Sequence, residues 1–437
     1  MKIVFITHYF PPLNSSGARR INSFAKYLSA WGHQITVITT RKTERDGLLT
    51  EGVPNYLQLL EIDNFGRLSP SAMPEKAETG ARFGVETRSH IGRTLLKVKR
   101  AVMKISGQLV DHRLFFALQF ASPMLANEVK KALKEADVVM SSCPPWPTHL
   151  AGWFIKKIYR KFWVADYRDQ FSGNHILLGS SISRYLEVRL EHWLLRAADC
   201  VTVISGPMKE YYEQFHAQVF CIENGYDENV FEDAMHSGVA AQSQVNSSEL
   251  VIRYMGLISA DRMPLVFLRA ISRLNQRAGK TFIAEFYGES TLLRKTLQDL
   301  VPEAVPYVRF FPQLRHVDAI RATLTADAMF IVETSDFSSY SARGVLTTKL
   351  FEYLAAKKPV VAEISPRSLV AQYIERSGLG VVVTQDIEEM LRGLSLLREG
   401  SFKFDPDEVF IASLSRKVKA QELEKLLNQK IPSVANR

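Results

Sequence analysis

Short apolar runs alternate with amphipathic stretches along most of the chain. KIVFIT (2–7) predicts a buried parallel strand, ARRINSFAKYLSAWG (18–32) an amphipathic helix that ends at Gly32, and QITVITT (34–40) the next strand. A strand, a loop, a helix and a second strand in this order open a doubly wound fold. Further strands are predicted at 137–145, 162–169, 200–205 and 219–225, with helices between them. Apolar strands that alternate with helices indicate a parallel sheet covered on both faces.

A second series of the same kind follows a break in the pattern. Residues 233–248 are small, polar and aperiodic, which predicts an interdomain linker. Beyond it, strands are predicted at 250–256, 282–288, 308–312, 328–334 and 359–365. The sequence thus predicts an α/β protein with two doubly wound domains, residues 1–232 and 249–405. A helical C-terminal segment, residues 406–437, is expected to pack back on the first domain. Because ligands of open α/β sheets bind beyond the carboxyl ends of the strands, we expect the two sheets to face one cleft.

Composition narrows the classes of partner. The 437 residues are 46% hydrophobic and 23% charged, as in ordinary soluble proteins, and the formal net charge is +9. A basic balance favours an anionic partner, but nucleic acid is disfavoured because there is no Arg-rich tail and no basic run interleaved with aromatics. The cysteines form no CxxC pair and the histidines no ligand spacing, so no metal is expected. No signal peptide or membrane span is predicted, which favours the cytoplasm.

The segment 82–105 is strongly basic, and two interpretations of it remain open. Leucine, valine and isoleucine are interleaved with its cationic residues, and Glu86 is the only acid. It predicts either a basic amphipathic element that lies on anionic lipid at the inner face of the plasma membrane, or a solvated charged helix face. The cationic residues are Arg82, Arg88, Arg93, Lys97, Lys99, Arg100 and Lys104.

Two places in the first half carry candidate chemistry. Gly17 precedes a helix, where backbone amides can approach an anion; a plain turn glycine is the alternative. Gly17 has no glycine partner at the spacing of GxGxxG, so a dinucleotide cofactor is disfavoured. Asp166, Arg168 and Asp169 stand at the carboxyl end of a strand. They are expected to face the cleft, the alternative being a capping or ion-pair role.

The second half presents cations at the predicted starts of helices. Lys349 opens the helix of TTKLFEYLAAKKPVV (347–361), and Arg262 opens one after the strand that ends at Gly256. A cation there opposes the helix dipole, unless an anion such as a diphosphate lies in front of the helix. For Arg262 alone, a solvated surface side chain is the alternative. Glu352 either suits the dipole of its helix or accepts hydrogen bonds from a vicinal diol, as acids do for ribose.

These residues resemble the retaining GT-B glycosyltransferases of family 4, a family that includes bacterial polysaccharide and lipopolysaccharide transferases. The family's fold is two Rossmann-like doubly wound domains facing across a cleft. The resemblance covers most of the chain outside about 41–110. The stretches that carry it are FITHYFPPLNSSGARRINSFAKYLSAWGHQITVIT, SSCPPWPTHLAG, VADYRD, AADCVTVIS, ENGYDENVF, YMGLISADR and TTKLFEYLAAKKPVVA.

The resemblance implies transfer of a sugar, with retention of configuration and without a metal, from a nucleoside-diphosphate sugar to a glycan or lipid-linked acceptor. No further cofactor is implied. The catalytic set it implies is Arg262 and Lys349, on the diphosphate, with Asp166. The donor-binding set is Gly17, Gly256, Gly288, Gln313, Leu314, Gly344 and Glu352, and the acceptor-side set is Arg168, Asp169 and His149.

Two positions depart from the family's pattern. The family usually has two glutamates spaced eight residues apart; Glu352 matches the second, and Gly344 stands at the first. Leu257 stands where the family often has an arginine, which makes Lys349 the candidate second cation. The missing glutamate keeps open a catalytically inactive donor-binding subunit. A sugar-nucleotide epimerase on the same fold is the other alternative.

Overall fold

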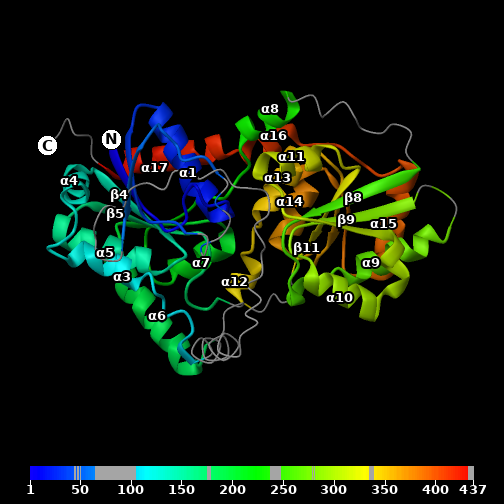
Figure 1. The fold of residues 1–437 in the computed structure, drawn as a ribbon, viewed down its shortest axis with the longest axis horizontal. Coiled ribbons are helices and arrows are strands. Elements are labelled where there is room, and N and C mark those ends of the chain that lie inside the picture. Colours follow the sequence, from blue (N-terminus) through cyan, green and yellow to red (C-terminus); the bar gives the residue numbers. More distant parts are fainter. Residues whose placement is uncertain are drawn as a thin grey trace. The chain divides into compact units, whose positions relative to one another are not determined.

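The structure is a computed structural model in which the chain divides into two compact units (Figure 1). The first contains Met1–Glu223, Ser339–Gly344 and Ala420–Arg437, and the second Asn224–Ser338 and Val345–Lys419. The described residues are 1–43, 46, 49, 51–63, 105–174, 179–236, 248–277, 279, 281–333 and 339–431. The basic residues 82–104 and most of the expected linker, 237–247, therefore lie outside the described part of the chain.

The first unit is built on a seven-stranded parallel sheet in the order β3-β2-β1-β4-β5-β6-β7. Every residue of β4 is buried, as expected for a strand covered on both faces. The strands are β1 (Lys2–Ile6), β2 (Gln34–Thr40), β3 (Gln58–Ile62), β4 (Val138–Cys143), β5 (Phe162–Tyr167), β6 (Cys200–Val203) and β7 (Val219–Cys221). Its helices are α1 (Ser16–Ala30), α3 (Leu114–Leu118), η2 (Gln119–Ala121), α4 (Asn127–Glu135), α5 (Pro147–Tyr159), α6 (Ser181–Leu195), α7 (Gly206–Glu213) and α12 (Tyr340–Arg343).

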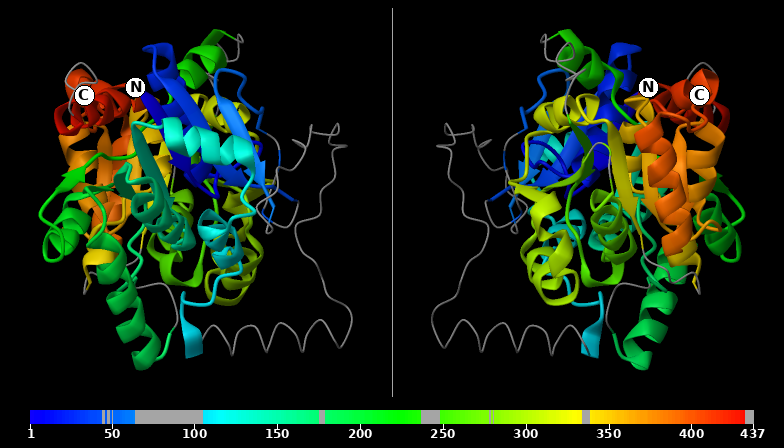
Figure 2. Two further views of the ribbon diagram at one scale, coloured as in Figure 1. Left: turned by 90° about the vertical axis from the view of Figure 1, so that its left-hand side faces the viewer. Right: turned by 90° about the vertical axis from the view of Figure 1, so that its right-hand side faces the viewer.

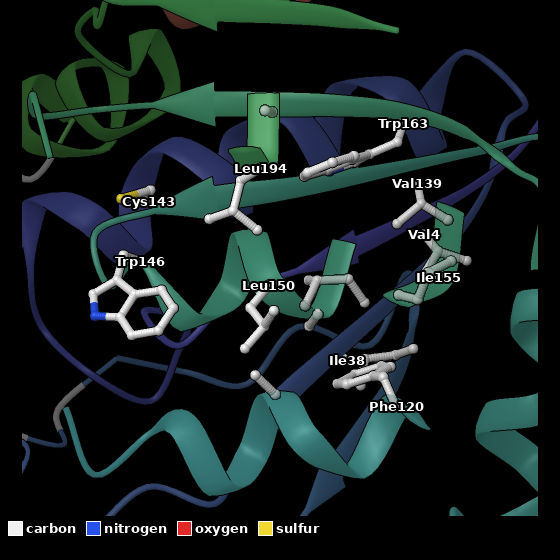
Figure 3. Packing of buried hydrophobic residues seen from close by; sticks show 14 of the residues in the cluster. Val4, Ile38, Phe120, Val139, Cys143, Trp146, Leu150, Ile155, Trp163 and Leu194 are labelled. Carbon is white, nitrogen blue, oxygen red and sulfur yellow. The ribbon is translucent and has the colours of Figure 1, made fainter. Parts of the chain in front are cut away.

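Apolar layers cover both faces of this sheet. On one face, Trp163, Val139 and Leu150 pack with Phe120 and Ile38 (Figure 3). On the other, a second cluster combines residues of β1 and α1 with leucines of the last helix, α17 (Arg416–Lys430). Those leucines are Leu423, Leu426 and Leu427.

The second unit is built on a six-stranded parallel sheet in the order β10-β9-β8-β11-β12-β13. The strands are β8 (Glu249–Met255), β9 (Thr281–Tyr287), β10 (Val308–Phe311), β11 (Ala328–Val332), β12 (Val360–Glu363) and β13 (Gly380–Thr384). The helices are α8 (Glu228–His236), η4 (Ala260–Arg262), α9 (Leu265–Asn275), α10 (Thr291–Leu300), η5 (Pro302–Tyr307), α11 (His316–Leu324), α13 (Thr348–Ala355), α14 (Leu369–Ser377), α15 (Ile387–Glu399) and α16 (Glu408–Ser413).

The expected fold class, two doubly wound α/β domains, is confirmed. Strands β3 and β13 were not predicted, and residues 233–236 belong to α8 where the sequence pattern predicts linker. None of the described helices is long and apolar enough to cross a membrane.

Candidate active site

Two glycines meet at the carboxyl ends of β8 and β9 in the second unit. Gly256 and Gly288 have φ of +123° and +130°, values that side chains rarely adopt. The Gly256 amide donates to the Tyr287 carbonyl over 2.8 Å. A Cβ added to Gly288 would lie 2.9 Å from the Gly256 carbonyl oxygen, and one added to Gly256 would lie 3.7 Å from Lys349 Nζ. The sheet thus brings together three residues selected from the sequence: Gly256, Gly288 and Lys349.

Lys349 is held in place by a buried tyrosine. Its backbone amide donates to the side chain of Thr347, the N-cap of α13, over 3.3 Å. Its Nζ donates to the Tyr254 hydroxyl over 2.6 Å and lies 4.2 Å from the centre of that ring. The Tyr254 hydroxyl donates in turn to the Leu257 carbonyl over 2.9 Å. Tyr254 thus holds the Lys349 ammonium at the end of β8. Tyr254 is not among the site residues predicted from the sequence.

Arg262 lies in the same unit, but not where the sequence pattern predicts. It ends η4, and α9 begins only at Leu265, so Arg262 is not in the first turn of that helix. The argument from the helix dipole is therefore wrong for Arg262. Its Nη1 donates to Glu333 Oε2 over 2.9 Å, and Asp261 Oδ2 lies 3.5 Å from its Nε.

Glu333 is a carboxylate that the sequence analysis missed. It directly follows β11 and is 5% exposed. Among the described residues, its Oε1 has no hydrogen-bond partner. Burial raises the pKa of Glu333, while the charges of Lys349 and Arg262 act in the opposite direction. One buried carboxylate is thus electrostatically coupled to both candidate diphosphate cations. The signal in the sequence was an acid directly after the apolar run AMFIV.

Glu352 faces a histidine that was also missed. Its Oε1 lies 2.8 Å from Nε2 of His316, the first residue of α11, and both side chains are largely buried. Gln313 and Leu314 come between β10 and His316; Gln313 is exposed and Leu314 half-buried.

Gly344 ends α12 in the first unit, where an added Cβ would lie 2.8 Å from Ser205 Oγ.

In the first unit, Asp166 forms a buried ion pair. Its oxygens accept from Arg20 Nη2, Ser142 Oγ and Thr202 Oγ1, each over 2.9 Å, and its side chain is fully buried. Burial alone would raise the pKa of Asp166, but the Arg20 charge and these hydrogen bonds outweigh it and lower the pKa. Arg20 also donates to the carbonyls of Ile222 and Glu223 over 2.8 Å. Asp166 thus ties α1 to β4, β5 and β6.

Arg168 and Gly17 lie against each other. A Cβ at Gly17 would come 1.8 Å from Arg168 Nη1, so any larger residue would displace the guanidinium. Arg168 donates to the Pro144 carbonyl and lies 5.0 Å from the centre of the Tyr9 ring. Its Nε is buried without a partner among the described residues. Asp169, the next residue, is exposed.

His149 is buried in α5. Its Nδ1 lies 2.8 Å from Ser141 Oγ, and its ring packs edge-on against Tyr167 at 4.4 Å. Burial lowers the pKa of His149 to about 3, so the ring is neutral near pH 7. Its Nε2 has no partner among the described residues. The imidazole is thus an uncharged group behind the loop that precedes α5.

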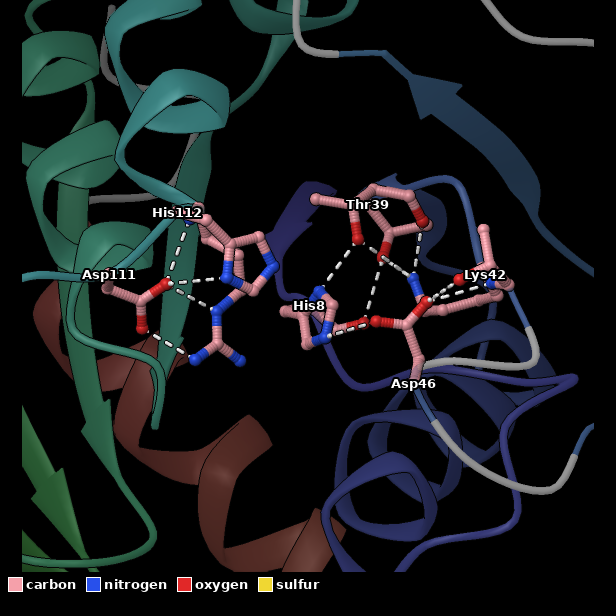
Figure 4. Close-up of polar contacts among 9 residues, drawn as sticks. His8, Thr39, Lys42, Asp46, Asp111 and His112 are labelled. Atoms are coloured by element: carbon pink, nitrogen blue, oxygen red, sulfur yellow. Dashed lines mark hydrogen bonds and ion pairs between the residues drawn. The ribbon is translucent and has the colours of Figure 1, made fainter. Parts of the chain in front are cut away.

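A further polar cluster lies beyond β1 and β2, and the sequence analysis missed it (Figure 4). His8 Nδ1 lies 2.7 Å from Thr40 Oγ1, and Lys42 Nζ donates to Thr39 Oγ1 over 2.8 Å. Burial and the nearby Lys42 charge lower the pKa of His8 to about 2, and burial lowers the pKa of Lys42 to about 8. Within the described part of the chain, no group of three or more His, Cys, Asp or Glu is arranged to hold a metal.

Comparison with known proteins gives a family for the first half of the chain. Residues 16–225 match the family described as "Glycosyl transferase 4-like domain". No curated protein matches the sequence.

Solved structures extend the likeness to the whole chain. Sucrose-phosphate synthase from Thermosynechococcus elongatus is 16% identical over 98% of each chain, with a TM-score of 0.63. HepE of Anabaena in complex with UDP is 14% identical over 98% of this chain and 100% of its own, with a TM-score of 0.62. The lipopolysaccharide outer core galactosyltransferase WaaB is 11% identical over 98% of this chain and 100% of its own, with a TM-score of 0.56. At these identities the likeness establishes the fold, which is GT-B.

The candidate residues divide between the two halves of the chain. The residues that match the family model, 16–225, contain Gly17 and all the residues expected on the acceptor side, together with Asp166. The group of glycines and cations at the strand ends of the second unit lies beyond residue 225. The family match therefore covers the acceptor-side candidates and none of the residues at the strand ends of the second unit.

Proposed function

We propose that this chain is a retaining glycosyltransferase. It would transfer a sugar from a nucleoside-diphosphate sugar to a glycan or lipid-linked acceptor, in the cytoplasm and in the synthesis of a surface polysaccharide. The observation that carries the proposal is the group of Gly256, Gly288, Lys349 and Arg262 in the second unit. Glycine backbone at strand ends, which no side chain covers, and two cations suit the binding of a diphosphate. The glycosyl transferase 4-like domain supports the reaction class, and HepE, solved with UDP and with UDP-glucose, supports the kind of donor.

The chemistry in this proposal depends on stabilising the leaving group. Lys349 and Arg262 would neutralise the charge that develops on the departing diphosphate, an electrostatic contribution that needs no metal. Tyr254 would hold the Lys349 ammonium in position before the donor arrives, through its hydrogen bond of 2.6 Å. Because the ammonium is already oriented, less reorganisation is needed in the transition state.

The nucleoside would be held by residues that follow β9 and β10, by the first residue of α11 and by α13. Glu352 would accept hydrogen bonds from the ribose hydroxyls, and His316, 2.8 Å away, would orient its carboxylate. The base would lie beside Gly288 and the loop that contains Gln313 and Leu314. Gly344 is proposed as the point where the first glutamate of the family's pair has been lost.

The first unit would hold the acceptor. Arg168 and Asp169 would contact it, with His149 behind them, and Gly17 would leave room for the Arg168 guanidinium. Asp166 is fully buried and already bonded, so we assign it a positioning role through its ion pair with Arg20, in place of the catalytic role implied by the resemblance.

A panel of nucleoside-diphosphate sugars, incubated with the purified protein with and without lipid-linked and glycan acceptors, tests the proposal. Acceptor-dependent release of nucleoside diphosphate is the expected result. Lys349→Met should lower the rate by about tenfold to a hundredfold, because a charge-assisted contact contributes about 1.5–3 kcal/mol. Lys357→Met is the matched control: Lys357 follows the other end of the same helix and pairs with Glu408.

The same panel separates the alternatives. Sugar isomerisation without acceptor would identify an epimerase. Donor binding without turnover would identify a catalytically inactive donor-binding subunit, the alternative that the missing carboxylate at Gly344 favours. Equal rates for Lys349→Met and the control would contradict the assignment of Lys349 to the diphosphate.

A further inference from the structure

Helix α6 of the first unit exposes several apolar side chains and buries both of its acids. Ile182, Tyr185 and Leu186 are 73%, 62% and 47% exposed, whereas its acids, Glu187 and Glu191, are 4% and 0% exposed. A surface helix of a soluble protein normally turns its charged residues outward and its apolar residues inward. The exposed apolar positions, spaced three and four residues apart, form one stripe of the helix.

The exposed charged residues of α6 and its C-cap are all arginines. Arg184 and Arg189 on α6 and Arg196 at its C-cap are exposed, and the guanidinium of Arg189 lies 6.0 Å from the centre of the Tyr185 ring. The outward face of α6 therefore combines apolar and aromatic side chains with arginines, and both of the helix's acids are buried.

The inward acids are fixed by hydrogen bonds, so the helix cannot turn without losing them. The Gln108 amide donates to Glu187 over 2.7 Å, and the Tyr212 hydroxyl donates to Glu191 over 2.9 Å. Burial raises the pKa of both glutamates. Rotating either acid toward solvent would break these bonds and bury arginine or isoleucine in its place.

A neighbouring segment extends the same surface. The Ser180 hydroxyl donates to the Ile105 carbonyl over 2.8 Å, and Ile105 is 70% exposed. Gly107 lies against Glu187, where an added Cβ would come 2.3 Å from Oε1. In Figures 1 and 2, the N-terminal end of α6 projects beyond the other helices of the first unit, with the segment that begins at Ile105 beside it. We call Ile105, Ile182, Arg184, Tyr185, Leu186 and Arg189 the α6 face.

We propose that the α6 face docks on an anionic lipid bilayer. Isoleucine and leucine side chains would enter the boundary between headgroups and acyl chains, Tyr185 would lie at the headgroup level, and Arg184 and Arg189 would bind lipid phosphates. A second copy of the chain fits less well, because a symmetric dimer sets a patch against itself, and the α6 face has no acid that could pair with its arginines.

Docking is independent of the transferase reaction, although it would bring a lipid-linked acceptor close. Flotation of the full chain with vesicles tests it: phosphatidylcholine alone, or phosphatidylcholine with about 30% phosphatidylglycerol, whose anionic headgroups attract cations. We expect binding to the anionic vesicles, weakened by salt, and about tenfold weaker binding to the neutral ones.

Variants on and off the face locate the contact. Ile182→Ser with Leu186→Ser, and separately Arg184→Glu with Arg189→Glu, should each weaken vesicle binding by at least about tenfold. Leu300→Ser with Val409→Ser is the matched control, since these side chains of the second unit are 55% and 82% exposed. Circular dichroism and thermal melting should be unchanged in every variant, and so should transfer to a water-soluble acceptor.

Three outcomes would overturn the proposal. One is equal vesicle binding by the α6-face variants and the control. A second is absence of binding to either kind of vesicle. A third is a concentration-dependent dimer that the Ile182→Ser, Leu186→Ser variant loses, which would make the face a protein interface. Loss of all transferase activity with vesicle binding intact would count against the proposed function alone.

Discussion

Replacing Glu333 by glutamine should tighten the binding of a nucleoside diphosphate. Glu333 accepts from Arg262 over 2.9 Å and lowers the positive charge that Arg262 and Lys349 present. Glutamine keeps an oxygen for the hydrogen bond and removes the negative charge. Structural damage would weaken binding, so a gain of affinity separates the electrostatic effect from misfolding.

The magnitude follows from Coulomb's law. A phosphate on the opposite edge of the Arg262 guanidinium would lie about 8 Å from the carboxylate. At an effective dielectric constant of about 20, one unit charge at that distance contributes about 2 kcal/mol, or roughly a thirtyfold change in affinity. Salt would screen little of this, because the Glu333 side chain is 4% exposed.

Isothermal titration calorimetry with UDP measures the effect, with Glu285→Gln as the matched control. Glu285 is also buried and accepts from an arginine, Arg253 Nε, over 2.7 Å in the same unit. We expect its replacement to leave UDP affinity unchanged. Unchanged or weaker UDP binding by a folded Glu333→Gln protein would refute the reasoning.

Three further predictions concern backbone space, a buried ion pair and a buried acid. Gly288→Ala should weaken UDP binding by about tenfold, measured by calorimetry, because its Cβ would lie 2.9 Å from a backbone oxygen and its φ is +130°. Asp166→Ala should lower the free energy of unfolding in urea by about 3 kcal/mol, because it leaves the buried Arg20 without its carboxylate partner. Asp169 is exposed, so Asp169→Ala should change this free energy by less than about 0.5 kcal/mol. Burial raises the pKa of Glu191 to about 7, so the folded protein holds a proton that the unfolded chain has released, and stability should fall as pH rises from about 4.5 to about 7. Glu191→Gln should remove this fall, at most about 3 kcal/mol, in urea titrations at several pH values; an unchanged pH slope would contradict it.

The pattern of apolar residues along the sequence predicts most strands of both sheets. Strands such as β4 and β11 are largely apolar runs in which every residue is buried, as covering by helices on both faces requires. Strand β3 lies in a polar stretch whose period is weak, and it owes its place to pairing with β2. Pairing between strands is a tertiary contact that a local pattern does not contain.

The candidate site was only partly predictable for the same reason. Gly256 and Gly288 directly follow β8 and β9, and Lys349 lies at the start of α13, so all three carry local signals. Tyr254 lies 95 residues from Lys349 in sequence, and His316 lies 36 residues from Glu352. The fold brings such partners together from distant parts of the sequence, so no local spacing of residues identifies them.

The start of α9 shows a different kind of failure. Arg262 precedes an apolar run that resembles a helix from its first residue. However, Pro264 is the N-cap, and the carboxylate of Glu363 accepts from the first α9 amides, at Val266 and Phe267. An acid from β12 thus supplies the cap, and the cation stays outside the helix.

The last helix has a consequence for how the chain is made. The first unit is discontinuous: its sheet comes from the first 223 residues, yet Leu423, Leu426 and Leu427 of α17 complete one of its apolar layers. His33 in this unit also lies 2.8 Å from Glu424 of α17. During synthesis, the part of this layer that α17 covers remains exposed until the second unit has been translated. The amino-terminal half therefore depends on the carboxyl terminus to finish folding, and a chain released early would expose an apolar surface open to aggregation.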